Sequence, residues 1–396
     1  MTSSPSAADF RRRAISLERA TMPSALRRPG LWIGSFILLA NLHGSLLSDD
    51  DVGGDAPAPS PPAPGSSKTS AQGPKSPAEE KIDVCLSLRR TRRYDEAFAA
   101  LQQAAALQPS PVVAAQIVFR TGETQFRKAQ DAASGKLQGV DSEACLKEAI
   151  RSFELLGEKH PKDEITPEGV YMTGSAYLLL GDLEKALQLY RRAAVEYPAY
   201  TGRGKSLMRV GVCQAGLDDP ASARTTFRKY LQEFPSPPAD ASKVRKYLSE
   251  LELVGKPAPA LRVTSWLTSM VGPDGLKTFD GEVVVVVFFA TWCENCSAEM
   301  PHLRSLINTW SPRGVVFLGV SDPDDPKNTS SVPVYVQKNE IPFLDVGLDR
   351  GSQSSPAYKV TGLPGAALID RKGNIRWRGH LAFLPRPLLE KALAEK

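Results

Sequence analysis

Cysteine is scarce in this chain, and its net charge is small for its length. The 396 residues include five cysteines, and the formal charge at pH 7 is +5. Five scattered cysteines exclude a small scaffold held together by disulfides, which would be short and rich in cysteine. Much of the positive excess comes from arginines near the N-terminus rather than from one folded face, so we expect no nucleic-acid partner.

Proline is plentiful by contrast, with 32 residues, and the composition changes sharply along the chain. Residues 52–79 lack aromatic side chains and nearly all large aliphatic ones, so burial cannot offset the entropy lost on ordering them. We predict a disordered Pro/Ser/Gly linker there. The remaining length suits two folded domains, each able to bury its own core. We expect an all-α helical repeat at 80–250, followed by an α/β domain at 254–396.

An apolar run occupies residues 31–47, LWIGSFILLANLHGSLL, between several arginines and the aspartates at 49–51. Positive charge on the N-terminal side of such a run favours a cytoplasmic N-terminus. The run only just spans a bilayer and no convincing small-x-small cleavage site follows it, so a signal peptide and an uncleaved membrane anchor both stay open. Either one makes residues 1–51 a basic cytoplasmic segment with an export signal. The alternative is a buried helix of a soluble domain.

The segment at 80–250 has helical spacing, and four of its units end at Pro109, Pro161, Pro198 and Pro235. The clearest unit places small and aromatic residues at the spacings of a tetratricopeptide repeat: Gly174, Tyr177, Gly181, Ala186, Tyr190, Ala193 and Pro198. We predict a short repeat array that binds a protein partner, with a spacer or dimerisation block as the alternative. The isolated thiols in this region are interpreted as buried structural residues: Cys85, Cys145 and Cys213.

The segment GEVVVVVFFATWCENCSAEMPHLRSLINTW carries the chemistry. The apolar run at 283–289 predicts a buried central strand, and the following apolar positions at helical spacing predict a helix that begins near Cys293. Unpaired backbone N–H groups at a helix start stabilise a thiolate, so Cys293 is the expected nucleophile. Cys296, one turn further on, would resolve the mixed disulfide. We expect no metal, because a zinc or copper site would need ligands beyond the nearby His302 and His380. An inert structural disulfide is the remaining alternative.

The last part of the chain resembles the thioredoxin superfamily, and within it the membrane-tethered bacterial thiol oxidoreductases of the TlpA and ResA type. The resemblance rests on GKPAPAL at 255–261, FFATWCENC, AEMPHL and GLPGAALIDRKGNIRWRG, and it covers about a third of the chain. It implies that Pro364 is a cis-proline beside the dithiol, which leaves the backbone at Leu363 available to an incoming peptide. It also implies that Glu299 is a buried acid that exchanges a proton with Cys296.

Two residues beside the cysteines complete the predicted site. Trp292 is interpreted as a cover for the dithiol that contacts substrate. Many relatives have proline just before the second cysteine, whereas this chain has Asn295, so the direction of electron flow does not follow from the resemblance.

The leading hypothesis is therefore an enzyme of the bacterial cell envelope that reduces or exchanges disulfides in exported proteins. It would need no cofactor beyond its own Cys293–Cys296 disulfide, and a membrane electron donor would reduce it again. The resemblance suggests apocytochromes as one substrate class. A thiol peroxidase of the redoxin group is one alternative, although Ala290 stands where those enzymes have threonine. An envelope scaffold, with repeats that bind a partner and a redox-sensing domain, is the other.

Overall fold

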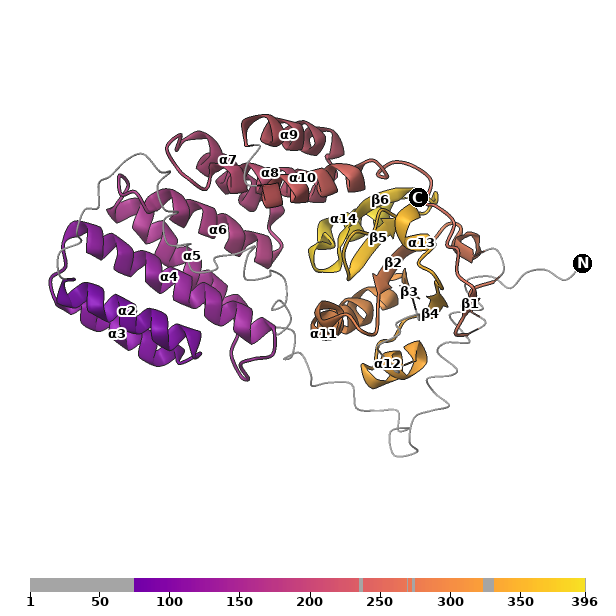
Figure 1. The fold of residues 1–396 in the computed structure, drawn as a ribbon, viewed down its shortest axis with the longest axis horizontal. Helices are drawn as coiled ribbons and strands as arrows, with labels where there is room; N and C mark the ends of the chain where they lie inside the picture. Colours follow the sequence, from indigo (N-terminus) through magenta and orange to yellow (C-terminus); the bar gives the residue numbers. More distant parts are fainter. Residues whose placement is uncertain (1–74, 235–237, 269, 273–274, 323–330, 396) are drawn as a thin grey trace, which may run out of the picture.

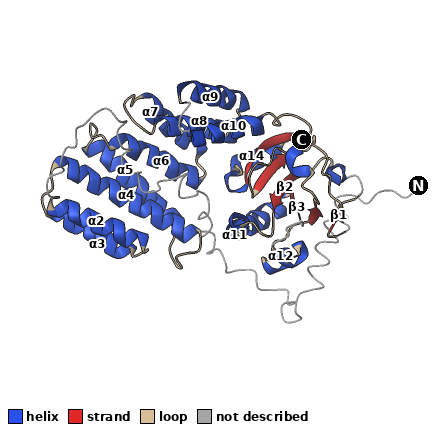
Figure 2. Cartoon of the chain, viewed as in Figure 1, coloured by secondary structure: helices blue, strands red, loops and turns tan. Residues whose placement is uncertain are grey.

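The computed structural model describes residues 75–234, 238–268, 270–272, 275–322 and 331–395, and it shows two folded parts (Figure 1). The predictions for residues 1–51 and for the linker up to residue 74 lie outside these described residues, as does Pro235. The first part is a series of antiparallel helices that forms an arc beside the second part. The described strands all belong to the second part, where helices cover a sheet (Figure 2).

The helical part runs from α2 to α10. Its elements are α2 (Pro77–Arg90), α3 (Tyr94–Ala106), α4 (Pro111–Ala133), α5 (Ser142–Lys159), α6 (Thr166–Leu180), α7 (Leu183–Val195), α8 (Arg203–Gly216), α9 (Pro220–Glu233) and α10 (Pro238–Leu251). Helix α2 begins three residues before the predicted start at 80. Ser76 and Glu79 explain this start, because each side chain caps a backbone N–H of the first turn in a reciprocal capping box.

The helices pair because small residues on one helix face aromatic rings on the next. Gly174 of α6 lies against Tyr190 of α7, and a Cβ atom added at Gly174 would lie 3.1 Å from that ring. The next pair repeats the arrangement with Gly211 of α8 and Phe227 of α9, where the same distance would be 2.5 Å. Glycine therefore allows two helices to approach closely while the ring fills the space between them. The three isolated cysteines are free and buried, as predicted.

The second part contains a six-stranded sheet in the order β1-β4-β3-β2-β5-β6. The strands are β1 (Ser265–Trp266), β2 (Val283–Phe289), β3 (Val315–Ser321), β4 (Asp345–Leu348), β5 (Gly365–Ile369) and β6 (Ile375–His380). The α-helices of this part are α11 (Glu294–Trp310), α12 (Val332–Lys338), α13 (Ser354–Ala357) and α14 (Arg386–Ala394), and the 3₁₀ helices are η2 (Gly275–Phe279), η3 (Ser311–Arg313) and η4 (Leu381–Phe383). Strand β2 pairs in parallel with β3 and antiparallel with β5.

Strand β2 is central and fully buried, as its unbroken apolar sequence predicted. Alternate residues enter two different cores. Val285 and Val287 join the core beneath α11, α12 and α14, whereas Val284 and Val286 join the core on the opposite face. Because both faces of the strand are covered, β2 is held firmly, and the loop that follows it starts from a fixed point.

The two parts meet where the C-terminal end of the helical arc lies against strand β6. Arg376 of β6 forms an ion pair of 2.5 Å with Asp218, in the turn between α8 and α9, and Lys391 of α14 pairs with the same carboxylate. Glu250 of α10 lies 3.8 Å from Arg378, and both side chains are almost fully buried. These contacts fix the repeats to the edge of the sheet.

Candidate active site

The predicted dithiol lies where the central strand gives way to a helix. Cys293 is the N-cap residue of α11, and Cys296 is the third residue of that helix. The structure joins their sulfur atoms in a disulfide, with the two Cα atoms 5.2 Å apart. The Sγ atom of Cys293 also accepts the backbone N–H of Cys296 at 3.1 Å. A reduced Cys293 would therefore carry its negative charge at the positive end of the helix dipole.

The two cysteines differ in their access to solvent. Cys293 is 9% exposed and Cys296 is completely buried. An incoming sulfur can therefore approach only Cys293, whereas Cys296 is held behind it in the core beneath the sheet. This difference fits a nucleophile and a resolving cysteine.

Glu299 is buried one turn after Cys296 on the same side of α11, with 3% of its surface exposed. Burial raises the pKa of its carboxyl group to about 9, because the charged form is poorly solvated there. The carboxyl group is therefore mostly protonated at neutral pH. Such a buried acid can give a proton to a departing thiolate or accept one from a thiol.

The cis-proline implied by the resemblance is present. The bond between Leu363 and Pro364 is cis, and Pro364 directly precedes β5. Since Gly365 pairs with Phe288 of β2, the proline lies beside the end of β2, where the loop to Cys293 begins. Leu363 is partly buried and packs against both cores of the domain. The sequence signature around Pro364 thus lies near the end of the strand that leads to the dithiol, although 68 positions separate Pro364 from Cys296.

Trp292, the predicted cover, is 53% exposed beside Cys293. It is one of the few large apolar side chains on the described surface, and its position next to the reactive sulfur suits contact with a polypeptide.

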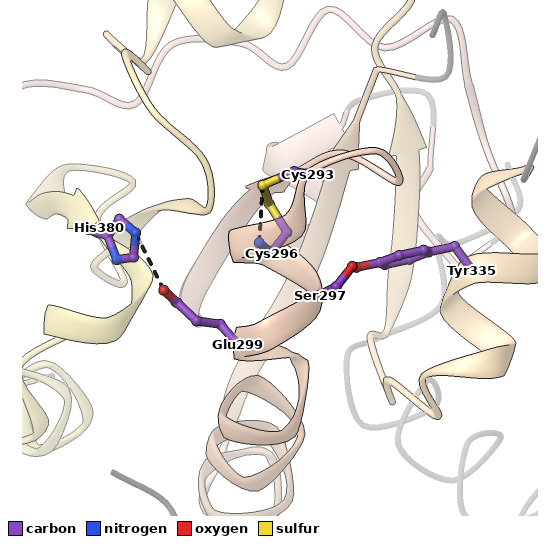
Figure 3. The surroundings of a disulfide bond; sticks show 6 residues. All are labelled: Cys293, Cys296, Ser297, Glu299, Tyr335 and His380. Atoms are coloured by element: carbon purple, nitrogen blue, oxygen red, sulfur yellow. Dashed lines mark hydrogen bonds and ion pairs between the residues drawn. A yellow bond between two sulfur atoms is a disulfide. The ribbon is translucent and has the colours of Figure 1, made fainter. Parts of the chain in front are cut away.

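On the opposite side of α11 from Glu299, Ser297 hydrogen-bonds the hydroxyl group of Tyr335 at 3.0 Å (Figure 3). Tyr335 in turn stacks on Phe289, the last residue of β2. This contact holds α12 against the start of α11.

His380 is a site residue that was not predicted from the sequence, where only a role as a metal ligand was weighed for it. Its Nε2 atom lies 3.4 Å from Oε1 of Glu299 (Figure 3). The sequence did hold a signal for this placement. Gly365 directly follows the cis-proline, and in the antiparallel pair of β5 and β6 it lies opposite His380. Among the described residues, no group of three or more His, Cys, Asp or Glu side chains is arranged to hold a metal ion.

In the part of the chain that the structure describes, none of the helices combines the length and apolar character needed to cross a membrane. The apolar run at 31–47 lies outside that part.

Comparisons with known proteins match both folded parts to families. Residues 254–378 match the AhpC/TSA family, and residues 141–201 and 205–237 match tetratricopeptide repeats. "Thiol-disulfide oxidoreductase ResA" of Bacillus thuringiensis is 30% identical over 122 residues, which are 31% of this chain and 66% of that protein. "Thiol:disulfide interchange protein HelX" of Rhodobacter capsulatus is 28% identical over 144 residues, which are 36% of this chain and 74% of HelX.

Among solved structures, StoA from Bacillus subtilis has 22% identity and a TM-score of 0.25, over 29% of this chain and 84% of that one. The matched part of this chain spans just under two thirds of the length of the ResA protein from Bacillus thuringiensis. The comparisons confirm the predicted resemblance to the ResA type and the predicted fold class. Tetratricopeptide repeats precede a thioredoxin-like domain.

Proposed function

We propose that this protein, in which tetratricopeptide repeats precede a thioredoxin-like domain, is an extracytoplasmic thiol:disulfide oxidoreductase. The observation that carries the proposal is the disulfide between an accessible Cys293 at the start of a helix and a fully buried Cys296. The names of the relatives ResA and HelX support the same chemistry. The reaction uses the chain's own disulfide and no further cofactor.

In the proposed reaction the reduced enzyme attacks a disulfide of a substrate protein. The thiolate of Cys293 bonds to one substrate sulfur, and the other leaves as a thiolate, which takes a proton from water. Cys296 then loses its proton to the ionised carboxylate of Glu299 and attacks the sulfur of Cys293. This step releases the second substrate thiolate and forms the Cys293–Cys296 disulfide. Two electrons have passed from the enzyme to the substrate.

Reduction of the enzyme requires a dithiol donor, and we propose one in the cytoplasmic membrane. A thiolate of the donor attacks Cys293, and the departing Cys296 takes the proton held by Glu299. The donor's second thiol then releases Cys293 as the donor becomes a disulfide. The raised pKa of Glu299 supports this step, since a carboxyl group that is protonated at neutral pH has a proton to give.

Substrates are proposed to be exported proteins, with apocytochromes as one class. Trp292, which is exposed next to Cys293 in the chain, and the backbone at Leu363, just before the cis-proline, are proposed to contact the substrate polypeptide. The cell envelope is the proposed location, with residues 31–47 as the signal peptide or anchor. The repeats are proposed to bind a protein partner and hold it near the dithiol, since ion pairs fix them to the same domain.

Reduction of insulin by the purified protein, with dithiothreitol as the electron source, tests the activity. Wild-type protein should accelerate the reaction, and Cys293→Ser should abolish the acceleration. An equal rate for both proteins would refute the proposed activity. Consumption of hydrogen peroxide that depends on Cys293 would instead favour a thiol peroxidase, which Ala290 argues against.

Trapping in cells identifies the substrates and tests the location. A Cys296→Ser variant should accumulate mixed disulfides through Cys293, because the resolving thiol is gone. Cys293→Ser is the matched control and should trap nothing. Envelope proteins among the trapped partners would support the proposed location, and exclusively cytoplasmic partners would contradict it.

A further inference from the structure

Glu299 is in contact with a histidine from a distant part of the chain. His380 ends β6, and Figure 3 shows the Glu299 side chain pointing from α11 toward it, on the side of the helix opposite Tyr335. The Nε2 atom of His380 lies 3.4 Å from Oε1 of Glu299. The histidine side chain is 29% exposed and the glutamate side chain 4% exposed, so the histidine connects a buried acid with the outside.

The two oxygens of the Glu299 carboxyl group have different surroundings. Oε1 faces His380, whereas Oε2 is buried and has no hydrogen-bond partner among the described residues. A buried polar atom without a partner is unfavourable and needs a physical reason. The redox state supplies one, because both cysteines are oxidised here and Cys296 has no proton to donate. Reduction would give Cys296, one helical turn before Glu299 in α11, a thiol proton.

The orientation of the imidazole ring is fixed by its own contacts. Its Nδ1 atom accepts the backbone N–H of Ala382 at 3.4 Å, and its ring meets Phe383 edge to face, with the centroids 6.0 Å apart. A neutral histidine whose Nδ1 accepts a hydrogen bond carries its proton on Nε2. That proton is therefore on the atom nearest to Glu299.

Other ionisable groups share this neighbourhood, since His380 lines a cavity of about 110 Å³ at the boundary between the repeats and the thioredoxin-like domain. The titratable and charged residues that line the cavity with it are His302 of α11, Tyr247 and Glu250 of α10, Arg378 of β6 and Arg386 of α14. Glu250 and Arg378 form a pair with each other. The contact with Glu299 comes from His380.

We propose that His380 is a positioning residue for the disulfide exchange, which stabilises the ionised carboxylate of Glu299 while that carboxylate accepts the proton of Cys296. This inference rests on the proposed function and adds to it a residue that acts through Glu299. The step is balanced: the proton moves from the Cys296 sulfur to Glu299, and the new Cys296 thiolate displaces the substrate thiolate from Cys293. In the reverse direction, Glu299 returns the proton to Cys296.

The need for such a residue follows from the burial of Glu299. A carboxyl group with a pKa of about 9 is ionised in only a small fraction of molecules at neutral pH. An N–H group close to the carboxylate favours its ionised form and so enlarges that fraction. Without His380, fewer molecules would have a carboxylate ready to deprotonate Cys296, and resolution would slow.

The reaction of the reduced protein with 5,5′-dithiobis(2-nitrobenzoate) separates the two steps. A first coloured thiolate is released when Cys293 attacks, and a second when Cys296 resolves the adduct. We expect His380→Phe to slow the second phase about tenfold at pH 7 and to move its pH midpoint upward by about one unit. The first phase should change less than about twofold, because Cys293 does not depend on Glu299. His380→Gln, which keeps an N–H donor, should restore part of the rate.

His302→Gln is the matched control, because it replaces the other histidine that lines the same cavity, on α11 itself. Its second phase should follow that of wild type. A wild-type pH profile for both His380 variants would overturn the proposal, as would an equal shift caused by His302→Gln. If His380→Phe does not fold, His380→Gln carries the test alone, with an expected slowing of about threefold.

The small disulfide reagent also separates this inference from the proposed function. A protein that shows the His380 effect but fails to reduce insulin would contradict the proposed function and leave the role of His380 standing. A protein that reduces insulin, but whose second phase does not change when His380 is replaced, would support the proposed function and contradict the role of His380.

Discussion

The guanidinium group of Arg378 lies 3.8 Å from the carboxylate of Glu250, across the boundary between the thioredoxin-like domain and the last repeat helix. Their side chains are 1% and 4% exposed. Arg378 also donates hydrogen bonds to the carbonyl oxygens of Tyr358, at 2.7 Å, and of Gly379, at 2.6 Å. A charge buried this deeply needs such partners. Arg378 therefore joins the last repeat helix to the sheet through a buried ion pair.

Replacing Arg378 with methionine should therefore destabilise the protein. The loss leaves Glu250 buried without its opposite charge, which typically costs about 3–5 kcal/mol. Burial already raises the pKa of Glu250, and the loss of Arg378 would raise it further. When a group has a raised pKa in the folded state, the protein loses stability as the pH rises. The destabilisation caused by Arg378→Met should therefore be largest above neutral pH and shrink toward pH 5.

Urea unfolding at pH 5 and pH 8 measures this dependence. The control is Lys359→Ala, which removes the more exposed pair with Glu252 between the same two parts. We expect a much smaller loss from the control, because exposed ion pairs contribute little. Equal losses for the two variants, or a loss for Arg378→Met that does not depend on pH, would show that the buried charge is not the cause.

The reduced protein should react with iodoacetamide first at Cys293. Cys293 is 9% exposed, whereas Cys296 is completely buried. Cys293 is also the N-cap residue of α11, where the helix dipole favours a thiolate. The pH midpoint of its alkylation should lie below that of a free thiol, which is about 8.5. Peptide mapping after brief labelling assigns the site. Faster labelling of Cys296, or a midpoint no lower than that of free cysteine, would contradict the assigned roles.

Glu299→Gln should make the oxidised protein more stable at alkaline pH while it slows resolution. Burial raises the pKa of Glu299 from 4.5 to about 9, so the folded protein keeps a proton that the unfolded chain releases between these values. The stability that depends on this group is full below pH 4.5 and is lost progressively as the pH rises toward 9. Glutamine has no proton to lose. Melting temperatures of the two proteins should therefore converge near pH 5 and separate by pH 8, and parallel curves would contradict the buried acid.

Local sequence was enough to predict the dithiol, because the strand, both cysteines and the helix that begins at Cys293 are continuous in the chain. The start of α2 was predicted three residues too late, although Ser76 and Glu79 have the spacing of a capping box. Glu299 and Pro364 came from the family resemblance, which supplies relationships between segments that periodicity does not.

The contacts of His380 and Arg378 could not be predicted in this way. His380 meets a residue 81 positions earlier, and Arg378 meets one 128 positions earlier, so no helical or strand period relates them. Arg378 also follows Trp377 in a strand whose sequence alternates apolar and basic residues. Such alternation is typical of a strand with one exposed face, yet the repeats cover this edge and bury the arginine.

Trp292→Ala should raise the KM for a protein disulfide with little change in kcat. The side chain is 53% exposed beside Cys293, so it is free to contact a polypeptide but adds little to the core. Binding that is equal in the ground state and the transition state affects KM alone. Steady-state reduction of insulin measures both constants, and a small disulfide serves as the control substrate. An equal loss with both substrates would place Trp292 in the chemistry of the dithiol instead.

Gly211→Ala should destabilise the repeats, although alanine is the better helix former. A Cβ atom at this position would lie 2.5 Å from the ring of Phe227, which is 1% exposed and has little room to move. Overpacking of this kind typically costs about 1–3 kcal/mol, and the gain in helix propensity of about 1 kcal/mol does not cancel it. Thermal unfolding followed by circular dichroism at 222 nm measures the balance.

Gly157→Ala separates the two effects. Gly157 lies within α5, and a Cβ atom there would have no neighbour within 4 Å. This variant has the helix-propensity gain without the clash, so its melting temperature should rise while that of Gly211→Ala falls. Opposite signs for the same substitution in two helices would show that the close approach of α8 and α9, and not the flexibility of glycine, requires Gly211. Two increases would mean that Phe227 can move aside, and the helix pair would then tolerate a wider separation.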